Sequence, residues 1–438
     1  MTGLPSGLVL LQDTAKARAI KKYILFITAK IGKIAIFVKH MPHISRLADN
    51  LPQSAIRALT PFAEKAEADG VKVYHLNIGA PDIKSPQVVV DAVHSYKFDH
   101  LPYSNSLGTR ELRQGFLDKY YNKLGLNLSL EDILVTTAGT EALDFFFQIT
   151  TNPGEEVIVF EPFYVNYNSI ALKYGIKLVP IHTDIREGFR LPPVEEIEKA
   201  VTPRTRAVLI SNPSNPTGTV FDRQELLAIA GICRKYDLFL GSDEVYREFC
   251  YSDKPIFSVM EIEDFDQYAI MLDSVSKRYN LCGARIGTIV SRNKEVMNLG
   301  LRLAQARLCP PVLAQAATLA ALDAPESYFE ETRSEYIRRR NFTVAALNRI
   351  PGVFSPMPNG AFYTIAELPV ESAADFCRWL LTDFRLDNQT VMLTPAAGFY
   401  GTKGQGLNQV RVAYVLEVPE LEKAMAVLEN ALKKYNDK

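Results

Sequence analysis

Residues 269–287 read AIMLDSVSKRYNLCGARIG: a short apolar run, two serines followed by Lys277, and then Arg285 between two glycines. The apolar run at 269–272 lacks the alternation of polar and apolar residues, which is typical of a strand covered on both faces by helices. In open parallel sheets, ligands bind beyond the carboxyl ends of the strands. The stretch therefore predicts a buried strand that delivers polar side chains to a ligand site.

Similar short runs occur on the amino-terminal side of this stretch, at residues 133–136, 156–160, 207–211 and 238–240. They alternate with helical stretches from about residue 91 to residue 323. This order is typical of βαβ units and of a mainly parallel sheet. We therefore predict an α/β fold whose large domain covers residues 91–325.

The sequence changes character after this region. Residues 326–349 form a long, charged helical stretch, followed by short strands near 360–363 and 409–413 and an amphipathic helix at 419–435. We expect a smaller α+β domain over residues 326–438. The segment 41–90 is expected to pack with it, because one helix and one short strand cannot form a core alone.

The composition excludes several classes of protein. With 47% hydrophobic residues in 438, the chain is neither disordered nor fibrous. A net charge of −1 gives no reason to expect a nucleic-acid partner. Five scattered cysteines lack the spacing of a disulfide framework or a zinc site, so we expect no metal and reduced thiols in a cytoplasmic protein.

Residues 1–40 are basic, with seven Lys or Arg and a single acidic residue, Asp13. Lysines interrupt their apolar pieces too often for a membrane span of roughly 20 residues. A transit peptide or a membrane-surface helix fits this composition. A start codon assigned too early also fits, because Met41 begins a natural-looking segment. We expect a disordered leader or a misassigned start, and no membrane partner.

Polar residues at the predicted strand ends form a set with a shared chemistry. Lys277 could form a Schiff base with a carbonyl compound. Ser274, Ser276 and Arg285 offer the donors that a phosphate dianion needs. Gly139 and Thr140, at the start of a predicted helix, add backbone N–H groups. Taken singly, such residues are more often solvated charges, helix caps or tight turns.

Two further residues extend the set. Asp243 follows the strand at 238–240, and a buried carboxylate there could pair with a protonated pyridinium nitrogen. Tyr246 lies three residues later, where its hydroxyl could hydrogen-bond a phenolate oxygen. An N-cap is the alternative role for Asp243.

Together these motifs resemble the pyridoxal-phosphate-dependent class I/II aminotransferases of fold type I, the aspartate aminotransferase-like proteins. The resemblance runs from about residue 44 to residue 434 and rests on Ser274-Val275-Ser276-Lys277 followed by Gly283-Ala284-Arg285-Ile286-Gly287. It implies a seven-stranded, mainly parallel sheet, pyridoxal 5'-phosphate as cofactor, amino acid and 2-oxo acid substrates, and a homodimer with shared active sites.

The resemblance also implies a role for each matching residue. Lys277 is the Schiff-base lysine and moves the substrate Cα proton, and Asp243 keeps the ring nitrogen protonated. Cofactor contacts are implied for Tyr246 and Asn215 at the phenolate oxygen, Tyr164 on the ring face, Gly139, Thr140, Ser274, Ser276 and Arg285 around the phosphate, and Tyr103 at the phosphate of the neighbouring subunit. Substrate contacts are implied for Asn215, Arg411 at the α-carboxylate and Gly79, whose backbone closes over it.

The sequence leaves the identity of the amino acid donor open. An acidic substrate needs a second cation, and Glu141 stands where one aspartate-specific branch has a lysine. Arg307 could supply the charge, although a salt bridge is its more ordinary role. The expected reaction is ping-pong transfer of an amino group from an L-amino acid, aspartate among the candidates, to 2-oxoglutarate.

Two alternatives remain open at this point. One is a related pyridoxal-phosphate enzyme, a carbon–sulfur β-lyase or an aminocyclopropanecarboxylate synthase, which shares nearly all these residues. The other is a non-catalytic regulator built on this fold. Intact Lys277 and Arg411 disfavour the regulator, as does a leader of forty residues, which is too short for a DNA-binding domain.

Overall fold

The structure is a computed structural model that describes residues 44–49, 51, 54–252 and 256–437 of the chain. The chain divides into two units, Met1–Asn50 and Leu51–Lys438. In the first unit, the described residues contain the short helix α2 (Arg46–Asp49). The basic leader predicted for residues 1–40 lies outside the described residues. Within the described ranges, no helix has both the length and the apolar character that crossing a membrane requires.

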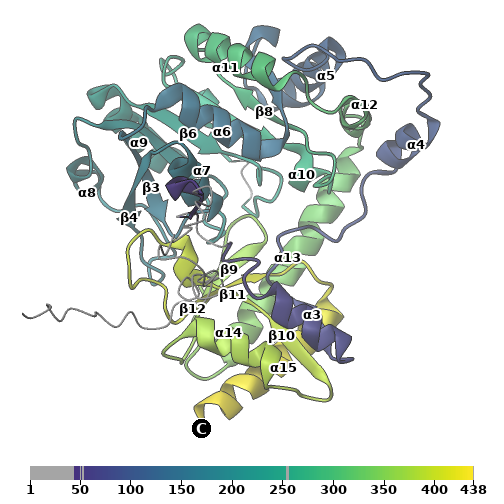
Figure 1. The fold of residues 1–438 in the computed structure, drawn as a ribbon, viewed down its shortest axis with the longest axis vertical. Helices are drawn as coiled ribbons and strands as arrows, with labels where there is room; N and C mark the ends of the chain where they lie inside the picture. Colours follow the sequence, from purple (N-terminus) through teal and green to yellow (C-terminus); the bar gives the residue numbers. More distant parts are fainter. Residues whose placement is uncertain (1–43, 50, 52–53, 253–255, 438) are drawn as a thin grey trace, which may run out of the picture. The chain divides into compact units, whose positions relative to one another are not determined.

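A seven-stranded sheet is the largest sheet of the second unit (Figure 1). In spatial order its strands are β2 (Ile133–Thr136), β8 (Gly287–Val290), β7 (Ala269–Ser274), β6 (Phe239–Asp243), β5 (Thr205–Ser211), β3 (Glu156–Glu161) and β4 (Lys177–His182). All neighbours from β7 to β4 pair in parallel, whereas β8 is antiparallel to both β2 and β7. The predicted α/β fold with a mainly parallel sheet is confirmed.

Side chains at alternate strand positions enter two separate cores. Val157 and Val159 contribute to the core that also contains residues of α6 (Ala138–Thr150), α7 (Asn166–Lys173) and α11 (Lys294–Arg307). Ile158 and Phe160 contribute to the other. That second core includes side chains from α5 (Arg110–Gly115), α9 (Arg223–Tyr236) and α12 (Val312–Ala321). Because helices cover both faces, both faces of the strands are apolar, which explains the continuous apolar runs in the sequence.

The other helices around the seven-stranded sheet are α4, α8, the one-turn helix α10 and the π-helix η1. Their bounds are Gln87–Ser95 for α4, Val194–Lys199 for α8, Val275–Arg278 for α10 and Phe116–Tyr121 for η1. Short 3₁₀ turns lie at Asn122–Leu124, Leu130–Asp132, Val259–Glu261 and Ala396–Phe399.

Two smaller sheets lie in the rest of the unit. One is antiparallel, in the order β11 (Thr394–Pro395), β12 (Gln409–Ala413) and β9 (Tyr363–Glu367). The other pairs β1 (Lys72–His75) in parallel with β10 (Gln389–Met392). Their core includes side chains from α3 (Thr60–Ala68), α14 (Ala373–Thr382) and α15 (Val418–Asn436). The β1–β10 pairing joins residues more than three hundred positions apart, which local sequence patterns do not reveal.

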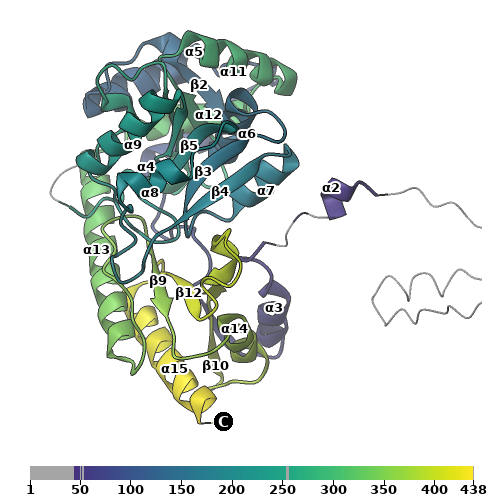
Figure 2. The ribbon, with the colours of Figure 1, turned by 90° about the vertical axis from the view of Figure 1, so that its left-hand side faces the viewer.

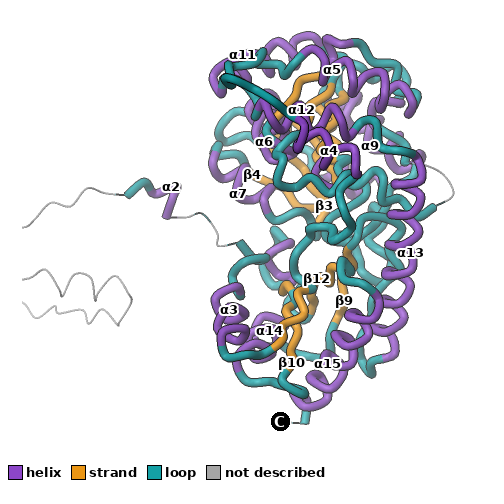
Figure 3. Tube along the Cα trace, turned by 90° about the vertical axis from the view of Figure 1, so that its right-hand side faces the viewer, coloured by secondary structure: helices purple, strands orange, loops and turns teal. Residues whose placement is uncertain are grey.

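Helix α13 (Glu326–Arg349) links the two sets of sheets, and Figures 2 and 3 show it running beside both. Near its start, Phe329 packs against a core of the seven-stranded sheet. Further along, Tyr336 and Leu347 belong to the core of the smaller sheets. The bounds of α13 agree with the helix predicted from the charge pattern.

Two strands of the large sheet were not recognised in the sequence. Strand β4 is an edge strand with partly exposed side chains, and Pro180 stands in the middle of its short apolar run, which argues against a strand in the sequence. Strand β8 begins at Gly287, the last residue of the motif that was quoted for Arg285. In both cases, pairing with a neighbouring strand outweighs a weak local signal.

Candidate active site

The carboxyl ends of three adjacent strands bring most of the predicted residues together. Strand β6 ends at Asp243 and β7 ends at Ser274, and these strands pair in parallel with each other. Strand β5 precedes the loop that carries Asn215. The start of α6 approaches the same edge, because a Cβ atom at Gly287 would lie 2.6 Å from the carbonyl carbon of Ala138 and 2.8 Å from the nitrogen of Gly139. Only glycine permits this contact between α6 and β8.

Lys277 lies on the one-turn helix α10, directly after β7. Ser274 caps this helix, because its hydroxyl accepts a hydrogen bond of 3.2 Å from the backbone N–H of Ser276. The Nζ atom of Lys277 donates to the carbonyl oxygen of Gly79 at 2.7 Å and lies 3.8 Å from the Sγ atom of Cys282. The amine is partly buried, and the two predicted residues Lys277 and Gly79 are in direct contact.

Gly79 is held against an aromatic side chain. A Cβ atom at this position would lie 1.6 Å from the hydroxyl oxygen of Tyr363. That hydroxyl donates to the carbonyl oxygen of Gly79 at 3.5 Å. The close approach of backbone and ring requires a glycine here, which supports the sequence prediction that this backbone borders the site.

The Asp243 carboxylate is buried and only half satisfied. Its Oδ2 atom accepts a hydrogen bond of 3.0 Å from the Tyr167 hydroxyl, whereas Oδ1 is buried with no hydrogen-bond partner among the described residues. Burial raises the pKa of Asp243 to about 6. A buried carboxylate oxygen without a donor is costly, and a ligand that brings a charged N–H to it would relieve that cost.

Tyr246 and Asn215, which were both predicted to contact the phenolate oxygen, hydrogen-bond each other. The Asn215 side-chain amide donates to the Tyr246 hydroxyl at 3.4 Å. The Tyr246 hydroxyl also lies 3.0 Å from that of Tyr363. All three side chains are buried, so they present a fixed group of donors at this edge of the sheet.

Arg411 carries a buried positive charge on β12. Its guanidinium donates to the carbonyl oxygen of Asn77 at 2.5 Å and to the Asn215 side-chain oxygen at 3.1 Å. It lies 4.4 Å from the ring centroid of Tyr363, and its Nε atom has no partner within the described ranges. Burial lowers the pKa of Arg411. None of these contacts is with a carboxylate, so the site suits an anionic ligand.

Three of the residues predicted to bind phosphate, Ser274, Ser276 and Gly139, lie close to one another. The Ser274 hydroxyl donates to that of Ser276 at 2.9 Å. Arg285 is exposed, with its guanidinium anchored by a 3.0 Å bond to the carbonyl oxygen of Cys282. A Cβ atom at Gly139 would lie 3.7 Å from that of Ser274, which places the start of α6 beside the serines. Two hydroxyls, a guanidinium and a helix N-terminus are donors that fit a phosphate.

Tyr164 lies next to the Asp243 group. Its ring packs edge-to-face on Tyr167, with centroids 5.6 Å apart, and its hydroxyl accepts from the Asn166 side chain at 2.8 Å. Thr140 is exposed on the first turn of α6. Tyr103 is 79% exposed and makes no hydrogen bond to the other predicted residues in the described part of the chain. The structure of one chain therefore does not bring Tyr103 into the group.

The two residues considered for a distal carboxylate pair with each other. Arg307 donates from Nε to Glu141 at 3.0 Å and from Nη2 to the carbonyl oxygen of Val135 at 3.1 Å. The other Glu141 oxygen accepts from the backbone N–H of Thr137 at 2.6 Å. The ordinary salt-bridge role for Arg307 is therefore the one that the structure shows.

Sequence reasoning missed several residues of this group: Asn77, Tyr167, Cys282 and Tyr363. Asn77 lies two residues before Gly79, so proximity in the sequence could have identified it, whereas Tyr363 stood only in a predicted short strand. Tyr167 contacts Asp243 from α7, seventy-six positions away, and no local signal marks it.

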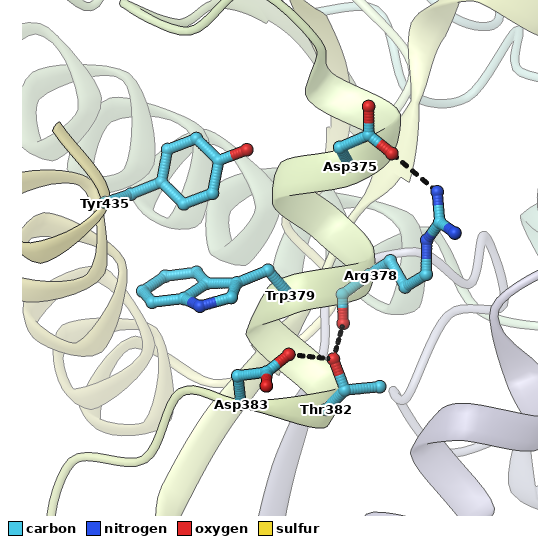
Figure 4. A pocket seen from close by; sticks show the side chains of 6 residues that line it. All are labelled: Asp375, Arg378, Trp379, Thr382, Asp383 and Tyr435. Atoms are coloured by element: carbon cyan, nitrogen blue, oxygen red, sulfur yellow. Dashed lines mark hydrogen bonds and ion pairs between the residues drawn. The ribbon is translucent and has the colours of Figure 1, made fainter. Parts of the chain in front are cut away.

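A separate hollow of about 470 Å³ lies on α14 and the end of α15 (Figure 4). It contains none of the predicted site residues. Within it, Arg378 pairs with Asp375, and Thr382 donates to the carbonyl oxygen of Arg378 at 3.0 Å. Figure 4 shows these polar groups turned toward one another, so the hollow does not compete with the strand-end site as a candidate active site.

Comparison with known proteins agrees with this geometry. Residues 71–428 match the family described as aminotransferase class I and II. An aspartate aminotransferase of Geobacillus stearothermophilus is 30% identical, covering 87% of this chain and 97% of the relative. An aspartate/prephenate aminotransferase of Thermus thermophilus is 30% identical, over 88% and 97%.

Solved structures give the same result. An alanine aminotransferase from Pyrococcus furiosus superposes with a TM-score of 0.81 at 31% identity, covering 90% of this chain and all of that one. A Thermus thermophilus aspartate aminotransferase with maleate gives 0.80 at 29% identity, over 89% of this chain and all of that one. From the matched pattern, the fold and the strand-end site together, we conclude that this chain belongs to the aminotransferase class I and II family.

Proposed function

We propose that this aminotransferase uses pyridoxal 5'-phosphate to move the amino group of an L-amino acid to a 2-oxo acid. The observation that carries the proposal is the pair of unmatched buried charges beside Lys277. Asp243 has a buried oxygen without a donor, and Arg411 has a buried guanidinium without a carboxylate. A cofactor with a protonated ring nitrogen and a substrate with an α-carboxylate would complement them.

The residues present fit the cofactor. Asp243 would hold the ring nitrogen, Tyr246 and Asn215 the phenolate oxygen, and Tyr164 one face of the ring. Gly139, Thr140, Ser274, Ser276 and Arg285 would hold the phosphate. When bound, pyridoxal phosphate supplies a carbonyl for the amine and an electron sink for the charge left at Cα.

The residues of the chain would then perform the remaining tasks. Lys277 carries the proton from the substrate Cα, since its Nζ atom is partly buried and directed toward Gly79. Arg411 and Asn215 grip the α-carboxylate, which fixes the direction of the Cα–H bond. The backbone at Gly79 closes over the carboxylate. This division of work favours loss of a proton over loss of carbon dioxide.

We also propose a homodimer whose active sites share Tyr103. Large apolar side chains are exposed in the segment before Tyr103, at Val93, Tyr96, Phe98 and Leu101. Leu308, which precedes α12, and Leu313, which lies in it, are exposed as well. Helices α4 and α12 pack together, so these segments form neighbouring surfaces. Exposed apolar side chains in such a concentration mark a contact surface, and a partner seated there would bring its Tyr103 to the neighbouring site.

The proposal names a class of amino acid donors and a first one to test. Aspartate is the first donor to test, because relatives at about 30% identity are named aspartate aminotransferases. The Arg307–Glu141 pair is engaged with itself and with backbone carbonyls, so a distal carboxylate would need another cation. 2-Oxoglutarate is the proposed amino acceptor.

The test begins with protein supplemented with pyridoxal phosphate. A visible absorbance band is expected. Borohydride reduction should attach the cofactor permanently to Lys277, and peptide mapping should locate the label there. Adding single amino acids in turn, with aspartate, alanine, phenylalanine and leucine first, should convert the band and release one oxo acid per site. Lys277→Ala is the control and should do neither. Release of ammonia with pyruvate would favour the lyase, and the absence of any band would overturn the proposal.

A further inference from the structure

A buried ion pair spans the segment that carries the lysine. Asp273 and Arg278 are bonded through Oδ2 and Nη2, and both side chains are 2% exposed. Between them in the sequence stand Ser274, Ser276 and Lys277, which are two of the predicted phosphate ligands and the predicted Schiff-base lysine. The pair therefore ties together the two ends of a single turn.

The Asp273 carboxylate is anchored on three sides. Its Oδ1 atom accepts from the backbone N–H of Ser274 at 2.7 Å. Its Oδ2 atom accepts from the Tyr121 hydroxyl at 3.0 Å, in addition to the guanidinium of Arg278. Tyr121 is in turn 2.6 Å from the hydroxyl of Thr288, on β8. The end of β7 is thus fixed to the neighbouring strand as well as to Arg278.

The guanidinium of Arg278 lies on an aromatic ring. Its Cζ atom is 3.7 Å from the ring centroid of Tyr120, whose hydroxyl donates to Glu248 at 2.6 Å. Tyr120 and Tyr121 are consecutive residues of the π-helix η1, and they contact the two members of the ion pair. Single-turn π-helices are rare and occur frequently at functional sites.

This arrangement is not what stability alone favours. Two charges removed from water are expensive, and apolar replacements of a buried pair are often neutral or stabilising. A buried pair does, however, fix its partners in one geometry, and precise placement of a catalytic group depends on such support.

Resting on the proposed function, we propose that Asp273 and Arg278, seated on Tyr120 and Tyr121, are positioning residues that hold Lys277 and the two phosphate-binding serines in register. Both side chains are buried. Their effect on the reaction passes through the turn that they close.

The experiment compares Arg278→Met, Asp273→Asn and the double variant with the wild-type protein, all with pyridoxal phosphate added. Cofactor affinity is measured by titration, and the pH titration of the visible band reports the surroundings of Lys277. Arg278→Met is expected to weaken cofactor binding by about tenfold or more and to move the titration of the band. The double variant, which removes both charges of the pair together, should recover thermal stability but not cofactor affinity.

Arg292→Met is the matched control. Arg292 pairs with Asp266 at 3.0 Å and with the carbonyl oxygen of Met260 at 2.9 Å, beyond the end of β8 that lies away from Ser274. Its loss should lower the thermal midpoint without changing cofactor affinity or the titration of the band. Wild-type affinity and an unchanged titration in the double variant would overturn the positioning role. A wild-type protein without a band would instead overturn the proposed function.

Discussion

Asp243 shows how a single buried residue links stability to function. Burial raises its pKa from 3.8 to about 6, so the ionised carboxylate lowers the free energy of unfolding of the apoprotein above that pH. The contribution of this group to stability is complete below pH 3.8 and is lost as the pH rises to about 6. The full difference corresponds to about 3 kcal/mol.

Asp243→Asn should therefore stabilise the apoprotein at pH 8 while reducing activity. The asparagine oxygen can still accept from Tyr167, but no carboxylate remains to hold a protonated ring nitrogen. Urea unfolding of the apoprotein at pH 8 and pH 5 measures the first effect, and turnover measures the second. An equal advantage for the variant at both pH values would contradict the assigned pKa.

Arg411 allows a prediction about substrate binding. Lysine at this position keeps a positive charge but loses the fork that contacts Asn77 and Asn215 together. Arg411→Lys should raise KM for the amino acid by about tenfold or more, the value of one lost charge-assisted hydrogen bond. Steady-state kinetics with the established donor measures this. Cofactor affinity, obtained by titration, should stay near that of the wild type, and a selective loss of cofactor binding would place Arg411 elsewhere in the site.

At the level of secondary structure, the contact between α6 and β8 determines where the proposed phosphate donors lie. A Cβ atom at Gly287 would lie 2.6 Å from the backbone of Ala138, whereas one at Gly283 meets nothing within 4 Å. Gly287→Ala should push the start of α6 away from Ser274 and weaken cofactor binding by about tenfold, because preorganised donors lose their geometry. Gly283→Ala is the matched control from the same motif. Fluorescence titration with pyridoxal phosphate distinguishes them, and equal affinities would contradict the role of this contact.

At the level of the whole molecule, the proposed dimer predicts complementation. Tyr103→Ala and Lys277→Ala should each be nearly inactive, because each breaks both sites of a symmetric dimer. In a mixed dimer, the subunit with Lys277 receives an intact Tyr103 from its partner, so one site of two works. Random mixing should restore about a quarter of the wild-type activity.

The mixing experiment requires exchange of subunits, which brief unfolding and refolding of the mixture provides. Each variant refolded alone is the control. No recovery, although light scattering shows dimers, would mean that Tyr103 acts within its own chain or not at all.

The type of fold could be predicted from sequence patterns alone, together with a set of candidate residues that the structure largely brings to one edge of the large sheet. Uninterrupted apolar runs predicted covered parallel strands because helices on both faces impose that pattern, and the structure has this sheet. Lys277 and Arg285 lie in one continuous segment between strands β7 and β8, so a local sequence motif was enough to identify both. The predicted roles of these residues stay predictions until they are tested.

Tertiary structure alone decided the contacts between distant segments. Tyr167 reaches Asp243 from α7, and Asn77 meets Arg411 across 334 positions. Strand β1 pairs in parallel with β10, and the Tyr121 hydroxyl hydrogen-bonds Asp273 across 152 positions. Local pattern reports which face of an element is buried, but not what covers it. The partners of a buried charge are set by packing of the whole chain, which is why they became visible only in the folded molecule.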